Sequence, residues 1–295
     1  MVHRISACSN LDEKTRASII ECLEKLPPFS PVLRRVLATL ILPQDKISLP
    51  HIADVIERDA LIAGRILGIA NSAAYNRGQA IFSIRHAVAR LGLQRVRNAV
   101  LAISVTRVWG GLGAPANFCM LRFNQHALAA ATASDLFVQH LSASDAEQAF
   151  AAGLFHDIGQ LVAANLHPNA YATLLEEKFS NGLELQERER ELFGFAHTDI
   201  SAEVTKYWNL PAEVQQAVLV HENPAQDDTR VSPGVLRLSE IVHAADAFVS
   251  GFGLWFSEEY PDSDANNLPL PIQADSVEEM STEFLETFRT LHPAA

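Results

Sequence analysis

The sequence contains few of the features that mark disulfide-rich, zinc-thiolate and membrane proteins. Its 295 residues include three cysteines, Cys8, Cys22 and Cys119, and no two of them have Cys-x-x-Cys spacing. An odd number of widely separated cysteines argues against a disulfide framework, so we expect reduced thiols with mostly structural roles. Polar residues also interrupt each hydrophobic stretch well before the roughly 20 residues that cross a bilayer. The sequence therefore predicts no membrane-spanning segment.

Positive charge is scarce as well. The chain has 23 Lys and Arg against 35 Asp and Glu, which gives a formal net charge of -12. This balance opposes general association with nucleic acids or anionic membranes, although it leaves room for local basic patches. The N-terminal run MVHRISAC has one Arg but no following apolar stretch of the length that an export signal requires. We expect a cytoplasmic protein with no membrane partner.

Apolar residues recur with the period of an α-helix through most of the chain. In residues 31–42 they fall at intervals of three and four, which places them on one broad stripe of a helix. Strand-like alternation is hard to find, and Gly and Pro cluster between the stripes. The pattern predicts an all-α fold of roughly a dozen helices. Comparable stripes occupy residues 52–70, 84–106, 120–138, 145–166, 211–220 and 233–249.

A break in the periodicity divides these stripes into two groups. Residues 110–117 read GGLGAPAN and form the best internal boundary. We therefore predict a two-lobed helical bundle, with residues 11–109 in the first lobe and 118–254 in the second. Residues 255–295 are expected to form an acidic linker and a C-terminal helix, which docks on a lobe through Val277, Met280, Phe284 and Phe288.

Several ionisable residues fall on apolar helical faces. His126 shares its stripe with Ala130, Ala133 and Phe137, so a helix would turn it inward. The same helical spacing of apolar neighbours places His221 and Asp246 on apolar faces. His156 and Asp157 end a strongly apolar helix, and His197 begins another. A buried carboxylate is unfavourable unless a cation, a metal or several donors lie beside it.

Two interpretations of these residues remain open from the sequence alone. Imidazole and carboxylate groups on facing helices can bind Fe, Mn, Zn or a similar divalent ion. The candidate ligands are His126, His156, Asp157, His197, His221 and Asp246. In the simpler interpretation, a backbone carbonyl satisfies each core histidine, and Asp246 caps a helix or pairs with an arginine.

Ordered and individually uncommon motifs run through residues 26–250. The first half carries LPPFSP at 26–31, IERDAL at 56–61, ANSAAY at 70–75 and LG at 91–92. The second half carries GLFHDIG at 153–159, FGFAH at 193–197, WNLP at 208–211 and HENP at 221–224. In these motifs the chain resembles the HDOD family, the HD-related output domains of bacterial signalling proteins. The resemblance implies an all-α fold of two lobes, the second similar to an HD domain.

The resemblance also implies roles for the six ionisable residues. In catalytic HD phosphohydrolases, the matching positions hold one or two metals. This chain departs from the HD-GYP phosphodiesterases of cyclic di-GMP, because Gln160 replaces their lysine and their His-His-Glu and Gly-Tyr-Pro signature is absent after His221. The cation that would hold a phosphate is therefore missing from its expected place. The family is generally regarded as regulatory or scaffolding, without demonstrated catalysis.

Three functions follow from these observations. We expect a non-catalytic signalling module that acts through signalling proteins or a small ligand such as a nucleotide, with Asn71, Ser72 and Tyr75 as candidate contacts. A structural role of Asn71 and Ser72, as a hydrogen-bonded helix end, is the simpler interpretation of that corner. The alternative function is a metal-dependent phosphohydrolase for a phosphoester such as a cyclic dinucleotide, with Fe, Mn, Zn or Mg.

The third function, nucleic-acid binding, is disfavoured. Residues 85–97 contain four arginines and no acid, and the run LGL at 91–93 resembles the turn of a helix-turn-helix. Four arginines in so acidic a chain usually form a solvated face.

Overall fold

The computed structural model describes residues 11–26, 29–39, 47–75, 78–254, 268–270 and 274–291. Cys8 and most of the predicted acidic linker lie outside these residues. In the described part, β-structure consists of one isolated bridge between Ala143 and Leu236, and the rest of the regular structure is helical. The predicted all-α fold is confirmed. No helix in this part is long and apolar enough to cross a membrane.

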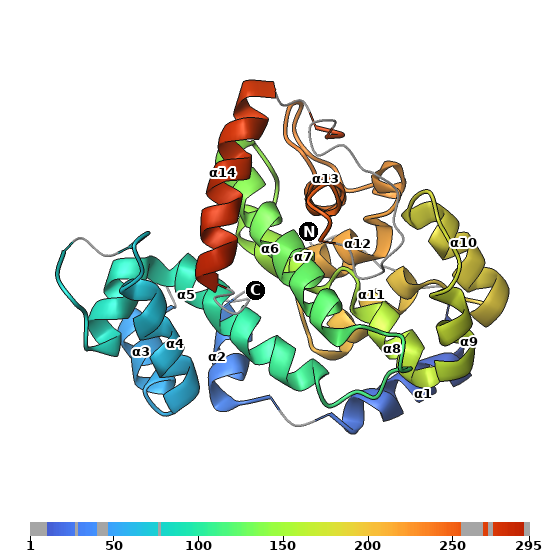
Figure 1. Ribbon diagram of the computed structural model, residues 1–295, viewed down its shortest axis with the longest axis horizontal. Helices are drawn as coiled ribbons and strands as arrows, with labels where there is room; N and C mark the ends of the chain where they lie inside the picture. The colour runs from blue at the N-terminus through green and yellow to red at the C-terminus, as the bar shows by residue number, and fades with distance from the viewer. Residues whose placement is uncertain are drawn as a thin grey trace. The chain divides into compact units, whose positions relative to one another are not determined.

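The chain divides into two compact units (Figure 1). Unit 1 comprises Met1–Leu26 and Leu112–Ser281, and unit 2 comprises Pro27–Gly111 and Thr282–Ala295. Helices of unit 2 are α2 (Pro31–Thr39), α3 (Leu49–Ile56), α4 (Ala60–Ala70) and α5 (Ile84–Trp109). Helix α14 (Ala274–Leu291) begins in unit 1 and ends in unit 2.

The remaining α-helices belong to unit 1. They are α1 (Glu13–Glu24), α6 (Met120–His140), α7 (Ala149–Phe155), α8 (Ile158–Leu166), α9 (Pro168–Leu174), α10 (Gly182–Phe193), α11 (His197–Tyr207), α12 (Ala212–Val220) and α13 (Leu238–Ser250). Short 3₁₀ turns precede α7 at Ala146–Gln148 and follow α12 at Pro224–Gln226.

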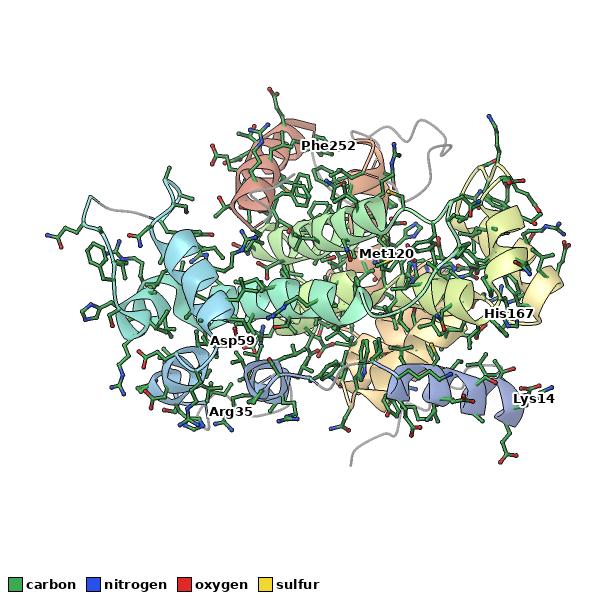
Figure 2. All side chains as sticks on the ribbon, turned by 60° about the horizontal axis from the view of Figure 1, so that its bottom comes forward. Lys14, Arg35, Asp59, Met120, His167 and Phe252 are labelled. Atoms are coloured by element: carbon green, nitrogen blue, oxygen red, sulfur yellow. The ribbon has the colours of Figure 1, made fainter. Side chains whose placement is uncertain are left out.

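Helix α1 lies in a different unit from the one that the sequence suggested. Residues 11–26 were predicted in the first lobe, whereas α1 packs against α8 and α11 of unit 1. Its buried side chains are Ile19, Cys22 and Leu23, and the Cys22 thiol donates to Asn165 Oδ1 of α8 at 3.1 Å. On the opposite face Lys14 points outward (Figure 2). The position of a segment in the sequence does not identify the surface that its helix covers.

Side-chain caps and one glycine define the helices of unit 2. Ser48 accepts from the His51 N–H at the start of α3, and Asp59 accepts from the N–H groups of Leu61 and Ile62 at the start of α4. Helix α5 packs against α2, α3 and α4 and is broken at Gly92, whose φ of 79° and ψ of 169° are not helical. Glycine adopts this positive φ without the steric penalty that a side chain would bring.

The corner after α4 is held by the side chain of Asn71. Its Nδ2 donates to Leu67 O at 2.9 Å and to Ile81 O at 2.8 Å, and its Oδ1 accepts from the Ile81 N–H at 2.8 Å. Ser72 Oγ donates to Ile69 O at 2.7 Å. These are the contacts of the structural interpretation, a helix end whose side chains fix the next turn.

Tyr75 completes this corner from the side of α5. Its carbonyl accepts from Arg90, and the Arg95 guanidinium lies 5.3 Å from the centre of its ring, a cation–π distance. Roles of Asn71, Ser72 and Tyr75 in ligand or partner binding stay predictions.

Small residues allow the helices of unit 1 to approach closely. Helix α6 packs against α7 and α13, which lie beside it in Figure 1. A Cβ added to Gly153 of α7 would meet the carbonyl oxygen of Ala130 in α6 at 2.7 Å. A Cβ added to Gly159 of α8 would meet the carbonyl oxygen of His197 in α11 at 1.9 Å. Both glycines are therefore required where helices bearing the candidate ligands meet.

Candidate metal centre

The six predicted ligands converge inside unit 1. Each is buried, with at most 7% of its surface exposed. They come from the middle of α6 and α13 and from the ends of α7, α8, α11 and α12. Because α7 ends at Phe155 and α8 begins at Ile158, the junction between the two helices consists of His156 and Asp157, and both turn inward.

Four of the ligands form the first half of the cluster. His126 Nε2 lies 3.1 Å from His156 Nε2, 3.4 Å from Asp157 Oδ2 and 3.3 Å from Asp246 Oδ1. His156 Nε2 lies 3.4 Å from Asp157 Oδ2 and 3.9 Å from Asp246 Oδ1. Two imidazole nitrogens and two carboxylate oxygens thus face one small volume.

The second half uses the other oxygen of Asp157. Asp157 Oδ1 lies 3.3 Å from His197 Nε2 and 3.7 Å from His221 Nε2. One carboxylate therefore faces both halves, with Oδ2 toward His126 and His156 and Oδ1 toward His197 and His221. The ligand atoms of His126, His156 and Asp157 lie close enough together to contact a single ion, and so do those of Asp157, His197 and His221.

The outer nitrogen of each histidine is held by a buried acceptor. Nδ1 lies 2.7 Å from Leu254 O for His126, 2.8 Å from Gly153 O for His156 and 3.0 Å from Val218 O for His221. A carbonyl oxygen only accepts, so Nδ1 must be the donor in each pair. In its neutral form, each of these rings presents the Nε2 lone pair to the cluster, as a metal-binding histidine does.

Glu189 plays the same part for His197, and reasoning from the sequence missed it. Its Oε2 lies 2.7 Å from His197 Nδ1 and accepts from the His197 N–H at 2.8 Å, and the residue is buried. Glu189 lies in the run ERERE at 187–191, which on sequence is typical of a solvated face. Burial of one acid in such a run depends on what packs against the helix.

Glu222 is a second missed residue. Its Oε1 lies 3.7 Å from the Nε2 atoms of both His197 and His221, and its carboxylate packs against the bare Cα of Gly182. Its position next to His221 was the available signal, because a residue that follows a ligand at a helix end can reach the same site. Together with Glu189, Glu222 brings the buried ionisable groups of the site from the six predicted ones to eight.

The cluster shifts the pKa values of its members in opposite directions. Burial alone would lower the pKa of His156, but the carboxylates of Asp157 and Asp246 together outweigh it and raise the pKa to about 9. For His197, burial is likewise outweighed by Glu189, Asp157 and Glu222 together, and the pKa rises to about 10. Burial, reinforced by the charge of His156, lowers the pKa of His221.

The carboxyl groups are similarly divided. Burial and the nearby Asp246 raise the pKa of Glu222 to about 8. Burial would also raise the pKa of Asp157, but the histidines around it, His156 foremost, hold it well below its usual range. Burial raises the pKa of Asp246 in spite of the neighbouring histidines. Such strong shifts at one place are typical of functional sites.

The unsatisfied polar atoms of the cluster fit a divalent metal. Among the described residues, Asp157 Oδ1, His197 Nε2, His221 Nε2 and Asp246 Oδ1 are buried and make no hydrogen bond. Leaving such groups unpaired in a protein interior is unfavourable. All four are ligand atoms for ions such as Zn²⁺, Fe²⁺ or Mn²⁺, and all four face the cluster.

The simpler interpretation accounts for part of this arrangement. Backbone carbonyls do accept from three of the four histidines, as it predicted. Asp246, however, lies within α13 beside His126 rather than at a cap, and its ion pairs in the described part are with His126 and His156. The hydrogen bonds from the Nδ1 atoms to backbone carbonyls therefore orient the histidines. They leave the unsatisfied Nε2 and carboxylate oxygen atoms of the cluster without partners among the described residues.

Comparison with known proteins gives one family. A family model described as the HDOD domain matches residues 26–224. The crystal structure of an HDOD domain protein with unknown function from Geobacter sulfurreducens matches with a TM-score of 0.75 at 21% identity, over 95% of this chain and 98% of that one. A candidate phosphohydrolase from Shewanella amazonensis matches with a TM-score of 0.66 at 20% identity, over 93% and 98% of the two chains.

A curated relative is longer than this chain. An uncharacterized protein of Treponema pallidum is 24% identical over 215 residues, which cover 71% of this chain and 40% of that protein. The aligned part of this chain thus spans about two fifths of that relative. At these identities the solved structures establish a shared fold.

Proposed function

This chain belongs to the HDOD family, and we propose that it is a non-catalytic signal-transduction module with a divalent metal site in unit 1. The observation that carries the metal site is the set of four buried histidines that direct Nε2 toward Asp157 and Asp246 while their Nδ1 atoms are held by buried acceptors. The module would act through signalling proteins or a small ligand, with the corner of Asn71, Ser72 and Tyr75 as a candidate contact surface.

The two halves of the cluster define where ions would be held. His126, His156, Asp157 and Asp246 would hold a first ion, and Asp157, His197 and His221 a second one beside Glu222. A bound ion would supply the positive charge that the buried carboxylates lack and would satisfy the inner nitrogens. A donor set this rich in imidazole favours Zn, Fe or Mn over Mg.

The burial of the cluster and the replacement of a lysine by Gln160 support a non-catalytic role. The cluster side chains are at most 10% exposed, so a phosphoester has little access to them in this conformation. Gln160 stands where the HD-GYP phosphodiesterases have lysine, is fully buried, and accepts from the Tyr171 hydroxyl at 3.4 Å. An amide cannot neutralise a phosphate, and electrostatic stabilisation is usually the largest contribution to phosphoryl transfer.

A second candidate, metal-dependent phosphohydrolysis, is favoured by one observation. Asp157 faces the two halves with separate oxygens. A carboxylate shared in this way is suited to a pair of ions, and paired ions are common in enzymes that cleave phosphoesters. The substrate would then be a phosphoester such as a cyclic dinucleotide.

Elemental analysis tests the metal site. The protein would be purified without chelator or metal-affinity chromatography, and its bound Zn, Fe and Mn measured beside Asp157→Asn, His126→Ala and the control His51→Gln, which alters an exposed histidine outside the cluster. We expect at least one ion per chain in the parent and control, and loss of metal from both cluster variants. Equal metal content in all four proteins would contradict the site.

Hydrolysis separates the two candidate functions. The metal-loaded parent would be assayed with bis(p-nitrophenyl) phosphate and cyclic di-GMP. We expect no turnover above buffer. Metal-stimulated turnover that Asp157→Asn abolishes and His51→Gln retains would show that the module is an enzyme.

A further inference from the structure

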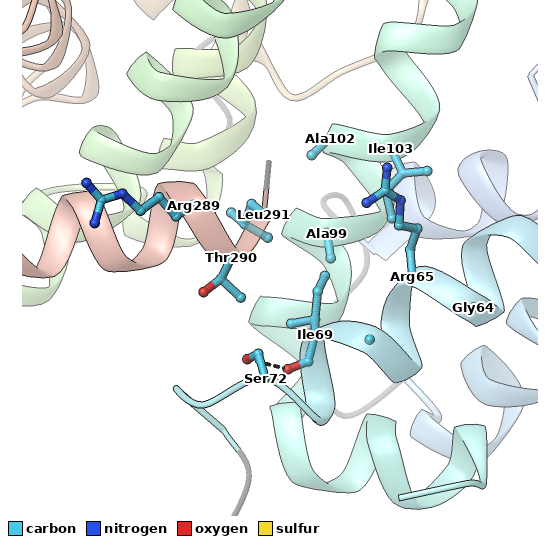
Figure 3. Close-up of a pocket in the computed structure, with 11 residues that line it drawn as sticks. Gly64, Arg65, Ile69, Ser72, Ala99, Ala102, Ile103, Arg289, Thr290 and Leu291 are labelled. Carbon is cyan, nitrogen blue, oxygen red and sulfur yellow. Dashed lines mark hydrogen bonds between the residues drawn. The ribbon is translucent and has the colours of Figure 1, made fainter. Parts of the chain in front are cut away.

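Unit 2 contains a cavity that is lined by none of the residues of the metal cluster. Its volume is about 390 Å³, and it lies among α4, α5 and the last turn of α14 (Figure 3). Small-molecule sites commonly have volumes of a few hundred Å³, so the cavity is large enough for a small ligand.

The walls of the cavity are largely apolar. Ile69 of α4, Ile103 of α5 and Leu291 of α14 line it, together with the small side chains of Ala99 and Ala102. Figure 3 shows these residues around a common space. An apolar body of a ligand would fit here without leaving a buried polar group unpaired.

Two glycines of α4 widen the cavity. Gly64 and Gly68 lie one turn apart and both line it. A Cβ built on either would meet no atom within 4 Å, so packing within the chain does not require glycine at these positions. Glycine weakens a helix relative to alanine. An occupant that approaches the bare backbone would account for both.

Positive charge lies at the cavity on two elements. Arg65 of α4 and Arg289 of α14 line it, both are exposed, and neither makes an ion pair with a described residue. In Figure 3, Arg65 runs beside Ile103, whereas Arg289 lies on the opposite side and its guanidinium points away from Arg65. Ser72 and Thr290 add hydroxyl groups to the lining. In a chain with a net charge of -12, a cavity whose charged lining is purely cationic selects anions.

We propose that this cavity binds a small amphipathic anion, with an apolar body against Ile69, Ile103 and Leu291 and its anionic group at the rim, within the positive field of Arg65 and Arg289. The proposal is independent of the metal site, because the cavity lies in unit 2. It assigns Ser72, a predicted contact residue, to the lining of a small-ligand site.

Isothermal titration calorimetry of the full chain tests this with three probes of equal chain length, octanoate, octyl phosphate and octanol. We expect the two anions to bind and octanol to bind at least tenfold more weakly, a difference of about 1.4 kcal/mol. A preference between octanoate and octyl phosphate identifies the head group. Equal affinity for octanol and the anions would overturn the proposal, as would the absence of binding by both anions, which is the result expected if a protein segment occupies the cavity instead.

Matched variants locate the binding. Gly68→Leu should fill the cavity and abolish binding while its Tm stays at or above that of the parent, because its Cβ meets no atom within 4 Å and leucine favours a helix more than glycine does. Arg65→Gln and Arg289→Gln should each weaken octanoate binding about three- to tenfold. The control Arg58→Gln alters an exposed arginine outside the lining and should bind as the parent does. Folded Gly68→Leu and Arg65→Gln proteins with parental affinity would show that the ligand binds elsewhere.

Discussion

The Asn71 corner of unit 2 and the ionisable cluster of unit 1 treat their polar groups in opposite ways. In unit 2, Asn71 uses both ends of its amide to satisfy backbone groups of Leu67 and Ile81. In unit 1, the cluster turns polar atoms toward one another and leaves several without hydrogen bonds in the described part. The Asn71 amide therefore stabilises its corner unaided, whereas the unsatisfied atoms of the cluster would become favourable with the cation proposed above.

Removal of metal should give the largest effect and should be confined to unit 1. A ligand that binds only the folded state, at a thousand times its Kd, adds about 4 kcal/mol of stability. We expect chelation by EDTA to lower the Tm of unit 1 and to speed amide hydrogen exchange in α6 and α13, with little change in α3 and α4. Uniform exchange before and after chelation, in protein shown to have carried metal, would contradict this contrast.

Gly159→Ala should damage unit 1 more than any other substitution that leaves the ligands themselves in place. The new Cβ would meet the His197 carbonyl, a backbone atom that cannot rotate away. We expect a loss at the upper end of the about 1–3 kcal/mol typical of overpacking, together with weaker metal binding, because α8 and α11 carry ligands. Urea denaturation checks this expectation. The control is Gly113→Ala, whose Cβ would make an ordinary 3.6 Å contact. Equal stability of the two variants would refute it.

Asn71→Leu should destabilise unit 2 without affecting the metal. It leaves the N–H and carbonyl of Ile81 without partners, which we expect to lower the free energy of unfolding by about 1–2 kcal/mol. Asn71→Asp keeps the acceptor and should lose less. Thermal denaturation with parallel metal analysis measures both effects. A stable Asn71→Leu protein that has lost partner binding would favour the contact role over the structural one.

Gly64→Ala should change the free energy of unfolding least, and it should stabilise the protein, whereas the preceding substitutions should destabilise it. Since the added methyl group meets no atom, the gain in helix propensity should raise the free energy of unfolding by up to about 1 kcal/mol. Gly78→Ala provides the contrast, because Gly78 has a φ of 92° that a side chain disfavours. If Gly64→Ala were as destabilising as Gly78→Ala, α4 would require glycine for its own packing.

Sequence periodicity predicted the parts of the site that lie on regular apolar stripes. His126 and Asp246 sit within helices whose neighbours at three and four residues are apolar, so their inward orientation followed from helix geometry. The convergence of the ligands did not follow in the same way, because it depends on which helices pack together. There the resemblance to the HDOD family, now shown by the match over residues 26–224, supplied the grouping.

Other features had no local signal. Glu189 is buried because α10 places it beside His197, although its neighbours in sequence are charged. The packing of α1 on α8 and α11, and the cavity formed by α4, α5 and the end of α14, join residues far apart in the chain. Such tertiary neighbours are not encoded in the period of one segment.

The position of Asp157 has a consequence for how the cluster could change during evolution. A substitution of His126 or His197 would damage one half and leave the other with its remaining ligands. A substitution of Asp157 removes an oxygen from both halves at once. In the proposed two-ion arrangement, descendants that retain Asp157 could lose one ion by gradual steps, whereas descendants that lose Asp157 would lose both ions together and would have to rebuild the interior of unit 1 with apolar residues.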